Sequence, residues 1–300
     1  MAKRYTVYGL ETIPEISQGS DLSQIIFDAA EREGVGFRDN DLVIVSSKAA
    51  AKSMGRYVDL STVRPSGRAM AIHRLTGKDA RRVQLILEEC KQVLGYFSTR
   101  RLARDEQFLH DYFGGAPSAE VLKRAEAVLL TEMSDGSLST DAGTDHSNMP
   151  SKDILCLLPR NPKRIADELR HSLESRSGCR LAVITSDSEV RMMRYGTEEI
   201  ALAWSGIQPI SRRFGAPDIY GRPKFGGVDA TADQAANAAG LLMGQTDERI
   251  PVVIIRGLRY ETEQEDTRLS MPLKYQSMFV FNTLLTHAKL RAAMILRRFL

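Results

Sequence analysis

Short apolar segments that alternate with helical patterns constrain the fold of this chain more than any other feature of the sequence. Apolar runs at 42–45, 127–130, 154–158, 181–185 and 252–255 have the length and branched side chains of buried strands. Helical patterns lie between several of them, but the order does not follow a strict strand–helix–strand repeat. We therefore predict an α+β fold rather than a doubly wound parallel sheet.

Several segments carry helical signals. Apolar residues recur at helical spacing over 22–30, and Asp21 or Ser20 is a candidate N-cap. The Ala-rich segment 231–243 is predicted to end at Gly244. Further helices are predicted over 78–93 and over 118–126, and Asn161-Pro162 is predicted to cap a third.

The composition narrows the class of protein. A hydrophobic fraction of 43% and a charged fraction of 26% are typical of a globular chain, and a net charge of +3 gives no argument for nucleic acid as a partner. Cys90, Cys156 and Cys179 lack metal-type spacing and are predicted to be reduced. The chain begins without a signal-like apolar run and has no span of about 18 apolar residues, so we predict a cytoplasmic protein.

The chain is predicted to divide into a body, 1–257, and a tail, 258–300. The tail starts with an acidic linker at 261–266 and continues as an amphipathic helix over 276–300 that is basic toward its end. Docking or dimerisation is the favoured role of this helix. Contact with a membrane surface is the alternative, because a basic amphipathic helix can also lie on a bilayer.

Four polar sites follow apolar segments, where proteins with mixed sheets assemble ligands. They are residues 9–16, Ser46-Ser47-Lys48 with Lys52, the loop 140–150, and Asp187-Ser188. The loop combines two carboxylates with glycine, hydroxyls and an amide, which suits a hard divalent cation held against phosphate oxygens. The chain has no Walker loop, dinucleotide fingerprint, nucleophile elbow or zinc-protease helix.

Seven sequence blocks, in order and with matching spacing over roughly residues 8–257, resemble the coenzyme F420-0:L-glutamate ligase family. The blocks are Ile-Pro-Glu-Ile (13–16), Ser-Lys-Ala-Ala-Ala-Lys (47–52) with Gly55-Arg56, Asp-Ala-Gly-Thr-Asp-His-Ser-Asn-Met-Pro (141–150), Val-Ile-Thr-Ser-Asp-Ser (183–188), Asp-Ile-Tyr-Gly-Arg (218–222), Leu-Met-Gly-Gln (242–245) and Pro-Val-Val-Ile-Ile-Arg-Gly (251–257). The resemblance implies a two-part α+β body that forms an intertwined homodimer. It also implies a ligase that uses GTP to activate a carboxylate as an acyl phosphate and joins it to the amine of L-glutamate, with F420-0 as the carboxylate acceptor.

The resemblance also implies roles for individual residues. Asp145 and Asp187 would hold one Mg²⁺ or Mn²⁺ ion, with Ser188 and Gln245 at a second, and Lys48 would join the two aspartates in catalysis. GTP would be bound by Ile13, Pro14, Glu15, Ile16, Ser47, Lys48, Lys52, Asn148, Met243, Gly244 and Gln245.

General chemistry agrees with these roles. Phosphoryl transfer places negative charge on oxygens in line, and bridging cations neutralise that charge. Mg²⁺ and Mn²⁺ prefer oxygen ligands, and lysines supply point charges for phosphates.

Each assignment has a simpler structural alternative. Asp145 and Asp187 could be loop and cap residues, and Lys48 and Lys52, four positions apart, could form one exposed helix face. Gln245 could be a solvated turn residue after a helix. His146 is interpreted as a neighbour of the site and not as a ligand.

The departures from the family pattern lie on the side expected to bind the acceptor. Glu132-Met-Ser-Asp-Gly136 replaces an Arg-x-His-Gly run, and the loop begins with Asp141 in place of Asn. The run after Asp187 keeps Arg191 and Arg194 but loses the family's Gly, Pro and Trp, and residues 99–120 read as an insertion. Three hypotheses follow: an F420-0 γ-glutamyl ligase, a related ATP- or GTP-dependent amide ligase with another acceptor or amino acid, and a non-catalytic nucleotide-binding or assembly protein.

Overall fold

A five-stranded mixed sheet forms the centre of the computed structural model, which describes residues 3–113, 116–190, 196–262 and scattered positions from 269 to 286. The strand order is β1-β12-β2-β8-β9, and β2 and β8 are the parallel pair among antiparallel neighbours. The parallel pairing brings the carboxyl ends of β2 and the apolar half of β8 to the same edge. The strands are β1 (Thr6–Gly9), β2 (Asp41–Ser46), β8 (Leu181–Val190), β9 (Thr197–Ser205) and β12 (Val252–Arg256).

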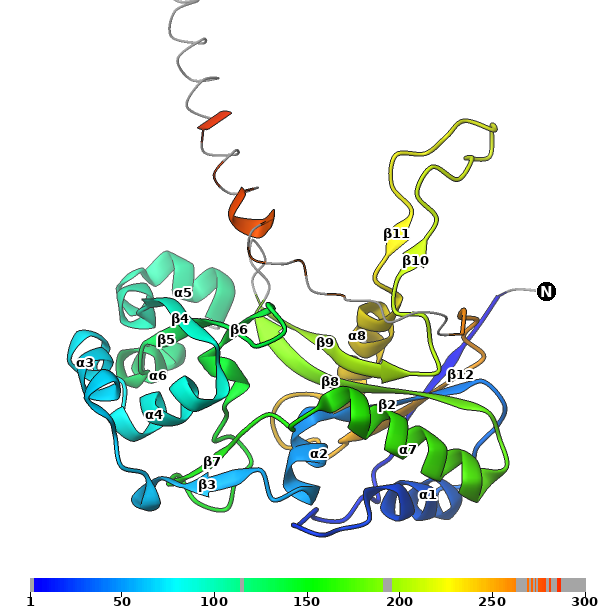
Figure 1. Ribbon diagram of the computed structural model, residues 1–300, viewed down its shortest axis with the longest axis horizontal. Helices are drawn as coiled ribbons and strands as arrows, with labels where there is room; N and C mark the ends of the chain where they lie inside the picture. The colour runs from blue at the N-terminus through cyan, green and yellow to red at the C-terminus, as the bar shows by residue number, and fades with distance from the viewer. Residues whose placement is uncertain are drawn as a thin grey trace, which may run out of the picture.

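Helices cover both faces of this sheet (Figure 1). Helices α1 (Leu22–Arg32) and α7 (Pro162–Ser177) pack on one face, and α8 (Thr231–Met243) packs on the other. Alternate residues of β2 and β8 face the two layers, so both strands are apolar at consecutive positions. This double burial explains why the two strands could be recognised in the sequence as continuous apolar runs.

A smaller part lies beside the central sheet, at the left of Figure 1. Its three-stranded sheet has the order β4-β5-β6, and the short pair β3–β7 lies between it and the main body. The α+β prediction is thereby confirmed. The remaining elements are α2 (Ser47–Ser53), β3 (Tyr57–Asp59), η1 (Leu60–Thr62), α3 (Gly67–Thr76), α4 (Ala80–Glu89), β4 (Gln92–Phe97), η2 (Thr99–Arg104), α5 (Glu106–Phe113), α6 (Ala116–Arg124), β5 (Val128–Glu132), β6 (Leu138–Thr140), η3 (Asp141–Gly143), β7 (Ile154–Cys156), β10 (Ser211–Arg212) and β11 (Val228–Asp229).

The largest differences in boundaries concern one predicted helix and one predicted strand. The helix predicted over 78–93 ends at Glu89, because residues from Gln92 onward pair with β5 as strand β4. The strand predicted to stop at Thr185 continues to Val190, because β9 pairs with it along its polar half. Asp187 therefore lies within a strand, at the point where its apolar run ends.

The helix-cap predictions had mixed outcomes. Asp21 caps α1 by accepting a hydrogen bond from the backbone of Gln24, and α8 ends at Gly244 as predicted. Asn161 precedes α7 in a left-handed conformation, but its side chain makes no capping bond.

Much of the predicted tail lies outside the described residues, which include neither 263–268 nor 287–300. Within the ranges described, no helix has the length and apolar character needed to cross a bilayer.

A buried ion pair between Asp41 and Arg256 lies at the start of β2. Asp41, which is 1% exposed, accepts hydrogen bonds from Nη2 and Nε of Arg256 at 2.6 and 2.9 Å. The same guanidinium donates to the carbonyl oxygens of Val35 and Gly36. This pair lies at the opposite end of β2 from Ser46.

Candidate functional site

The turn from β2 into α2 supplies the first residues of the site. Ser46 ends the strand and caps the helix by accepting a hydrogen bond from the backbone of Ala49 at 3.3 Å. The parallel register sets Ser46 beside Ser186, so the next residues of the two segments meet. Ser47 Oγ donates to Asp187 Oδ1 at 2.9 Å. Ser46 thus fixes where α2 begins, and Ser47, in the first turn of that helix, contacts Asp187.

Lys48 connects the same helical turn to the predicted metal loop. Its Nζ lies 2.6 Å from Asp145 Oδ2 and also donates to Oγ and the carbonyl oxygen of Ser147, at 2.6 and 3.2 Å. The backbone of Asp145 exchanges two hydrogen bonds with Cys156, at 2.9 and 2.7 Å. The loop is therefore tied to β7 by its backbone and to α2 by its side chains.

The two aspartates have contrasting electrostatic environments. Burial raises the pKa of Asp187 to about 7, with Glu199 and Glu189 adding to the rise and the Ser47 hydroxyl and Lys48 opposing it. Burial also acts to raise the pKa of Asp145, but hydrogen bonds from Lys48 and Ser147 outweigh it and leave the pKa below its usual value. Lys48 thus stabilises the ionised form of Asp145 more than that of Asp187.

The donor set suits a hard divalent cation. Asp187 is a largely buried carboxylate beside other carboxylates, and added positive charge would favour its ionised form. Asp145, Asp187 and the nearby serine hydroxyls offer only oxygen, the donor that Mg²⁺ and Mn²⁺ prefer. Across the described part of the chain, no three His, Cys, Asp or Glu side chains cluster as a protein-only metal site. Two carboxylates are fewer ligands than Mg²⁺ takes, so water or phosphate oxygens would complete its coordination.

Other predicted residues lie around this centre. Lys52 Nζ is paired with Glu15 Oε1 at 2.6 Å, which links α2 to the 13–16 segment. Asn148 Nδ2 donates to the carbonyl oxygen of Thr246 at 3.1 Å and so brings the loop to the segment after α8. Lys48 and Lys52 are both bonded and mostly buried, which argues against an exposed helix face.

The residues predicted for a second ion are not gathered around Asp187. Ser188 is exposed and projects from the opposite face of β8, because neighbouring strand residues alternate in direction. Gln245 donates a hydrogen bond to Thr197 at the start of β9.

Three residues predicted to contact the nucleotide lie in or beside packed segments. Ile16 and Met243 are buried, and Gly244 has a positive φ of 60° at the end of α8.

Sequence reasoning missed several neighbours of the site. Glu189 has the two-residue spacing from Asp187 that places both on one face of a strand, and this spacing could have indicated it. Glu199 on β9 adds through its charge to the rise that burial causes in the pKa of Asp187, while its own carboxylate accepts a hydrogen bond from Ser186 Oγ at 2.7 Å; it leaves no local signal in the sequence. His146, interpreted from the sequence as a neighbour of the site, lies next to Arg82, with Nδ1 at 3.5 Å from Nη2.

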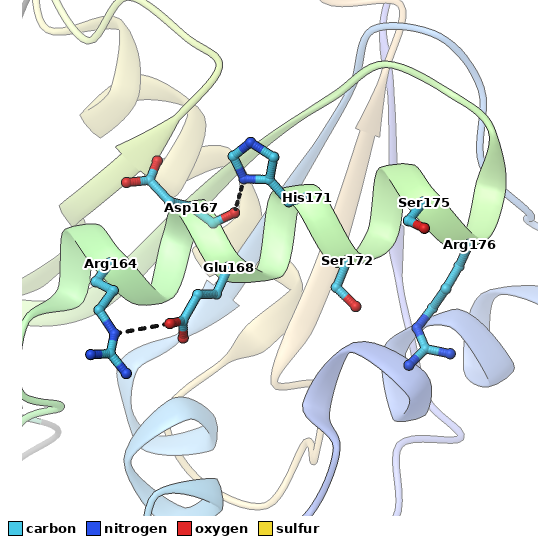
Figure 2. Close-up of a pocket in the computed structure, with 7 residues that line it drawn as sticks. All are labelled: Arg164, Asp167, Glu168, His171, Ser172, Ser175 and Arg176. Atoms are coloured by element: carbon cyan, nitrogen blue, oxygen red, sulfur yellow. Dashed lines mark hydrogen bonds and ion pairs between the residues drawn. The ribbon is translucent and has the colours of Figure 1, made fainter.

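A surface depression lies elsewhere, along the outer side of α7 (Figure 2). In this depression of about 700 Å³, Arg164 pairs with Glu168 at 2.9 Å and His171 Nδ1 lies 2.7 Å from the carbonyl oxygen of Asp167. These groups bond to one another along the helix and do not converge on a common point. The strand-end cluster of Ser47, Lys48, Asp145 and Asp187 is the better candidate for chemistry.

Comparison with known proteins gives one consistent family. Residues 11–257 match the family model described as F420-0:Gamma-glutamyl ligase. Coenzyme F420:L-glutamate ligase of Methanosarcina acetivorans is 32% identical over 273 residues, which cover 91% of this chain and 92% of the relative. Enzymes with the same name from Methanothermobacter thermautotrophicus and Methanocaldococcus jannaschii are 30% and 33% identical, over 92% and 73% of this chain and 98% and 76% of their own lengths.

Proposed function

Because the chain belongs to the F420-0:gamma-glutamyl ligase family, we propose that it is a GTP- and divalent-metal-dependent ligase that joins L-glutamate to a carboxylate acceptor of the F420-0 type. The observation that carries this proposal is the convergence on α2. Ser47 and Lys48, adjacent in sequence, contact Asp187 and Asp145 from two distant segments. These four positions are among those to which the family resemblance assigns metal and nucleotide contacts.

The reaction needs an activated carboxylate before the amide can form. The γ-phosphoryl group passes from GTP to an acceptor carboxylate oxygen and leaves GDP. The glutamate amine then attacks the acyl carbon, phosphate departs, and the amine loses a proton. Mg²⁺ or Mn²⁺ held by Asp145 and Asp187 would supply positive charge to the phosphate oxygens.

Individual residues of the chain have distinct tasks in this proposal. The ammonium of Lys48 donates hydrogen bonds to Asp145 and Ser147, and from this position it is proposed to contact phosphate oxygens. Lys52 and Glu15 hold the 13–16 segment against α2, where the nucleotide is proposed to bind. Asn148 ties the loop to Thr246 by a hydrogen bond and so joins two segments proposed to contact the nucleotide. Ser188 and Gln245 remain the proposed ligands of a second ion.

A second acceptor remains a candidate because of one specific observation. Glu132, in the run that replaces the family's Arg-x-His-Gly, is buried and accepts hydrogen bonds from Lys91 and Gln92 at 2.7 and 2.5 Å. A carboxylate engaged in this way does not supply the positive charge that an anionic acceptor would require. An amide ligase for a less anionic carboxylate is therefore the alternative function.

The test of the proposal couples nucleotide hydrolysis to amide formation. Purified protein is incubated with GTP or ATP, Mn²⁺ or Mg²⁺, L-glutamate and F420-0, and Asp187→Ala is the control. We expect glutamylated F420-0 and GDP from the native protein and neither from the variant. Metal-dependent GTP binding without product would favour the alternative acceptor, and no nucleotide binding would support a non-catalytic protein.

We also propose that the protein is a homodimer, and the arm 211–229 supports this. The arm leaves the body as the β10–β11 hairpin (Figure 1) and carries Ile219 and Phe225, which are 91% and 93% exposed. Phe214, also exposed, stacks edge-on against Phe225 at 5.4 Å between ring centroids. Large exposed apolar side chains on an ordered projection are typical of an interface.

Substitution of both arm phenylalanines, Phe214→Ser with Phe225→Ser, is expected to convert the dimer to a monomer. Light scattering after gel filtration, at several protein concentrations, measures the mass. Leu75→Ser removes an exposed apolar side chain from α3, outside the arm, and should leave the mass of the dimer unchanged. A native protein of monomer mass at all concentrations would refute the dimer.

A further inference from the structure

Lys78 is a buried charge that the proposed reaction does not use. It lies between α3 and α4 and is 2% exposed. Its Nζ donates to Asp141 Oδ2 at 2.8 Å and to the carbonyl oxygen of Ala127 at 3.1 Å, and Glu126 Oε2 lies 3.6 Å away. A buried ammonium is tolerated only with such partners, so its position is tied to theirs.

Asp141 is held on both sides of its carboxylate. While Oδ2 meets Lys78, Oδ1 accepts a hydrogen bond from the backbone of Leu129 in β5 at 2.9 Å. The carbonyl oxygen of Asp141 accepts from the backbone and the hydroxyl of Thr144, at 3.1 and 2.9 Å. These bonds fix Asp141, the first residue of η3, relative to Lys78 and β5. They also connect it to Thr144, the residue before Asp145.

The turn 141–143 has a left-handed backbone conformation, which is unfavourable for residues other than glycine. Asp141, Ala142 and Gly143 have φ values of 51°, 53° and 66°, all in the left-handed region. A Cβ on Gly143 would lie 2.5 Å from Leu158, so glycine is required there. Ala142 is fully buried and donates its backbone N–H to Thr131. Such a run persists only where its surroundings determine it, and it is often found at functional sites.

The turn 141–143 lies immediately before Thr144 and Asp145 in the chain. On its other side, Asp145 is fixed by the two backbone hydrogen bonds with Cys156. The direction of the Asp145 carboxylate toward Lys48 therefore depends on the turn before it as well as on β7. We infer that Lys78 and Asp141 are positioning residues that hold the turn 141–143 and so set the metal affinity of Asp145; this inference rests on the proposed function.

The test measures metal binding by the full-length protein rather than turnover. Mn²⁺ is titrated into metal-free protein with GTP, and free Mn²⁺ is followed by electron paramagnetic resonance well below the unfolding temperature of each variant. A matched titration without protein measures the Mn²⁺ that GTP alone binds, and this amount is subtracted. Lys78→Met is expected to weaken Mn²⁺ binding about 10-fold or more, as the loss of outer-shell partners commonly does. Asp141→Asn keeps an acceptor for the Leu129 N–H and is expected to have a smaller effect, about 3-fold.

Arg256→Met is the matched control. It also removes a cation from a buried pair, with Asp41, at the far end of β2. It should lower the unfolding temperature and leave the Mn²⁺ affinity unchanged. If Lys78→Met does not fold, Asp141→Asn carries the test.

The outcomes are distinguishable. Weakened Mn²⁺ binding in the Lys78 or Asp141 variant, with normal binding in Arg256→Met, supports the positioning role. Native affinity in both site variants, or equal weakening in the control, overturns it while leaving the proposed function intact. A native protein that binds no Mn²⁺ with GTP overturns the positioning role and the proposed function together.

Discussion

Replacement of Asp187 by Asn is expected to lower metal-dependent turnover by about 100-fold or more and, in the same protein, to stabilise the metal-free fold above pH 7. The loss of turnover follows from the loss of a carboxylate that is proposed to hold the cation near transferring phosphate. Asn keeps the size and an oxygen acceptor for the Ser47 hydroxyl, but it removes the negative charge. Turnover is measured as GDP release in the presence of glutamate and acceptor.

The stability effect has a defined sign and pH range. The pKa of Asp187 is about 7 in the fold and 3.8 for an ordinary aspartate, so between these values the folded protein retains a proton that the unfolded chain releases. Stability therefore falls as pH rises from about 4 to about 7, and the full cost remains above pH 7. Asn carries no charge, so its stabilising effect should be largest above pH 7 and disappear below about pH 4.

Thermal unfolding of metal-free protein between pH 4 and 8 measures this difference. Burial is the main cause of the raised pKa of Asp187, and the charged groups that act on it are Glu199 on β9, Glu189 on β8 and Lys48 on α2; together they set the pH at which the profile levels off. Asp28→Asn makes the same chemical change on the exposed side of α1 and is the matched control. Full turnover in Asp187→Asn would refute its role, and an unfolding temperature below native at pH 8 would refute the electrostatic account.

Lys48→Met is expected to reduce kcat/KM for GTP by about 100-fold or more, the scale of one lost electrostatic contact to a transferring group. Lys48 lies within hydrogen-bond distance of both Asp145 and Ser147, so its loss removes the cation between α2 and the loop. Without that cation, the pKa of the Asp145 carboxyl should rise. Met retains most of the buried stem, so the fold should be preserved.

A double-mutant cycle separates the two roles of Lys48. If Lys48 acts mainly by orienting Asp145, then Lys48→Met combined with Asp145→Asn should cost much less than the sum of the two single losses. If it also contacts phosphate, the double variant should bind GTP more weakly than Asp145→Asn alone. Lys123→Met, at an exposed i,i+3 pair with Glu120 on α6, controls for loss of a lysine. Equal kcat/KM in Lys48→Met and the native protein would remove Lys48 from the mechanism.

Local signals in the sequence were sufficient for the elements that lie closest to the site. The apolar run before Ser46, the cap at Asp21 and the Gly after Met243 are each decided by residues within a few positions, and the structure agrees with all three. The family resemblance implied that Ser47, Lys48, Asp145 and Asp187 share one site, but it did not imply the direct pairing of Ser47 with Asp187 or of Lys48 with Asp145. No periodicity in the sequence could have provided it.

The predictions that differed from the structure depended on distant partners. The polar half of β8 has no apolar pattern of its own and is a strand because β9 pairs with it. Residues 92–93 were assigned to a helix, and β5, more than thirty positions later, pairs with them as a strand. Lys78 was predicted only as the first residue of a helix, and the fold shows that Asp141 and Ala127 enclose its ammonium.

The parallel pairing of β2 with β8 has a consequence for how this protein matures. The Ser47–Asp187 contact spans 140 positions and the Lys48–Asp145 contact spans 97, so both close very long loops. Contacts of such high order form late in folding, because the entropy of loop closure must be lost before they stabilise the chain. During synthesis, α2 leaves the ribosome long before its partners do. A chain that binds GTP with Mn²⁺ would therefore already have assembled its central sheet, and ligand binding could report the completion of folding.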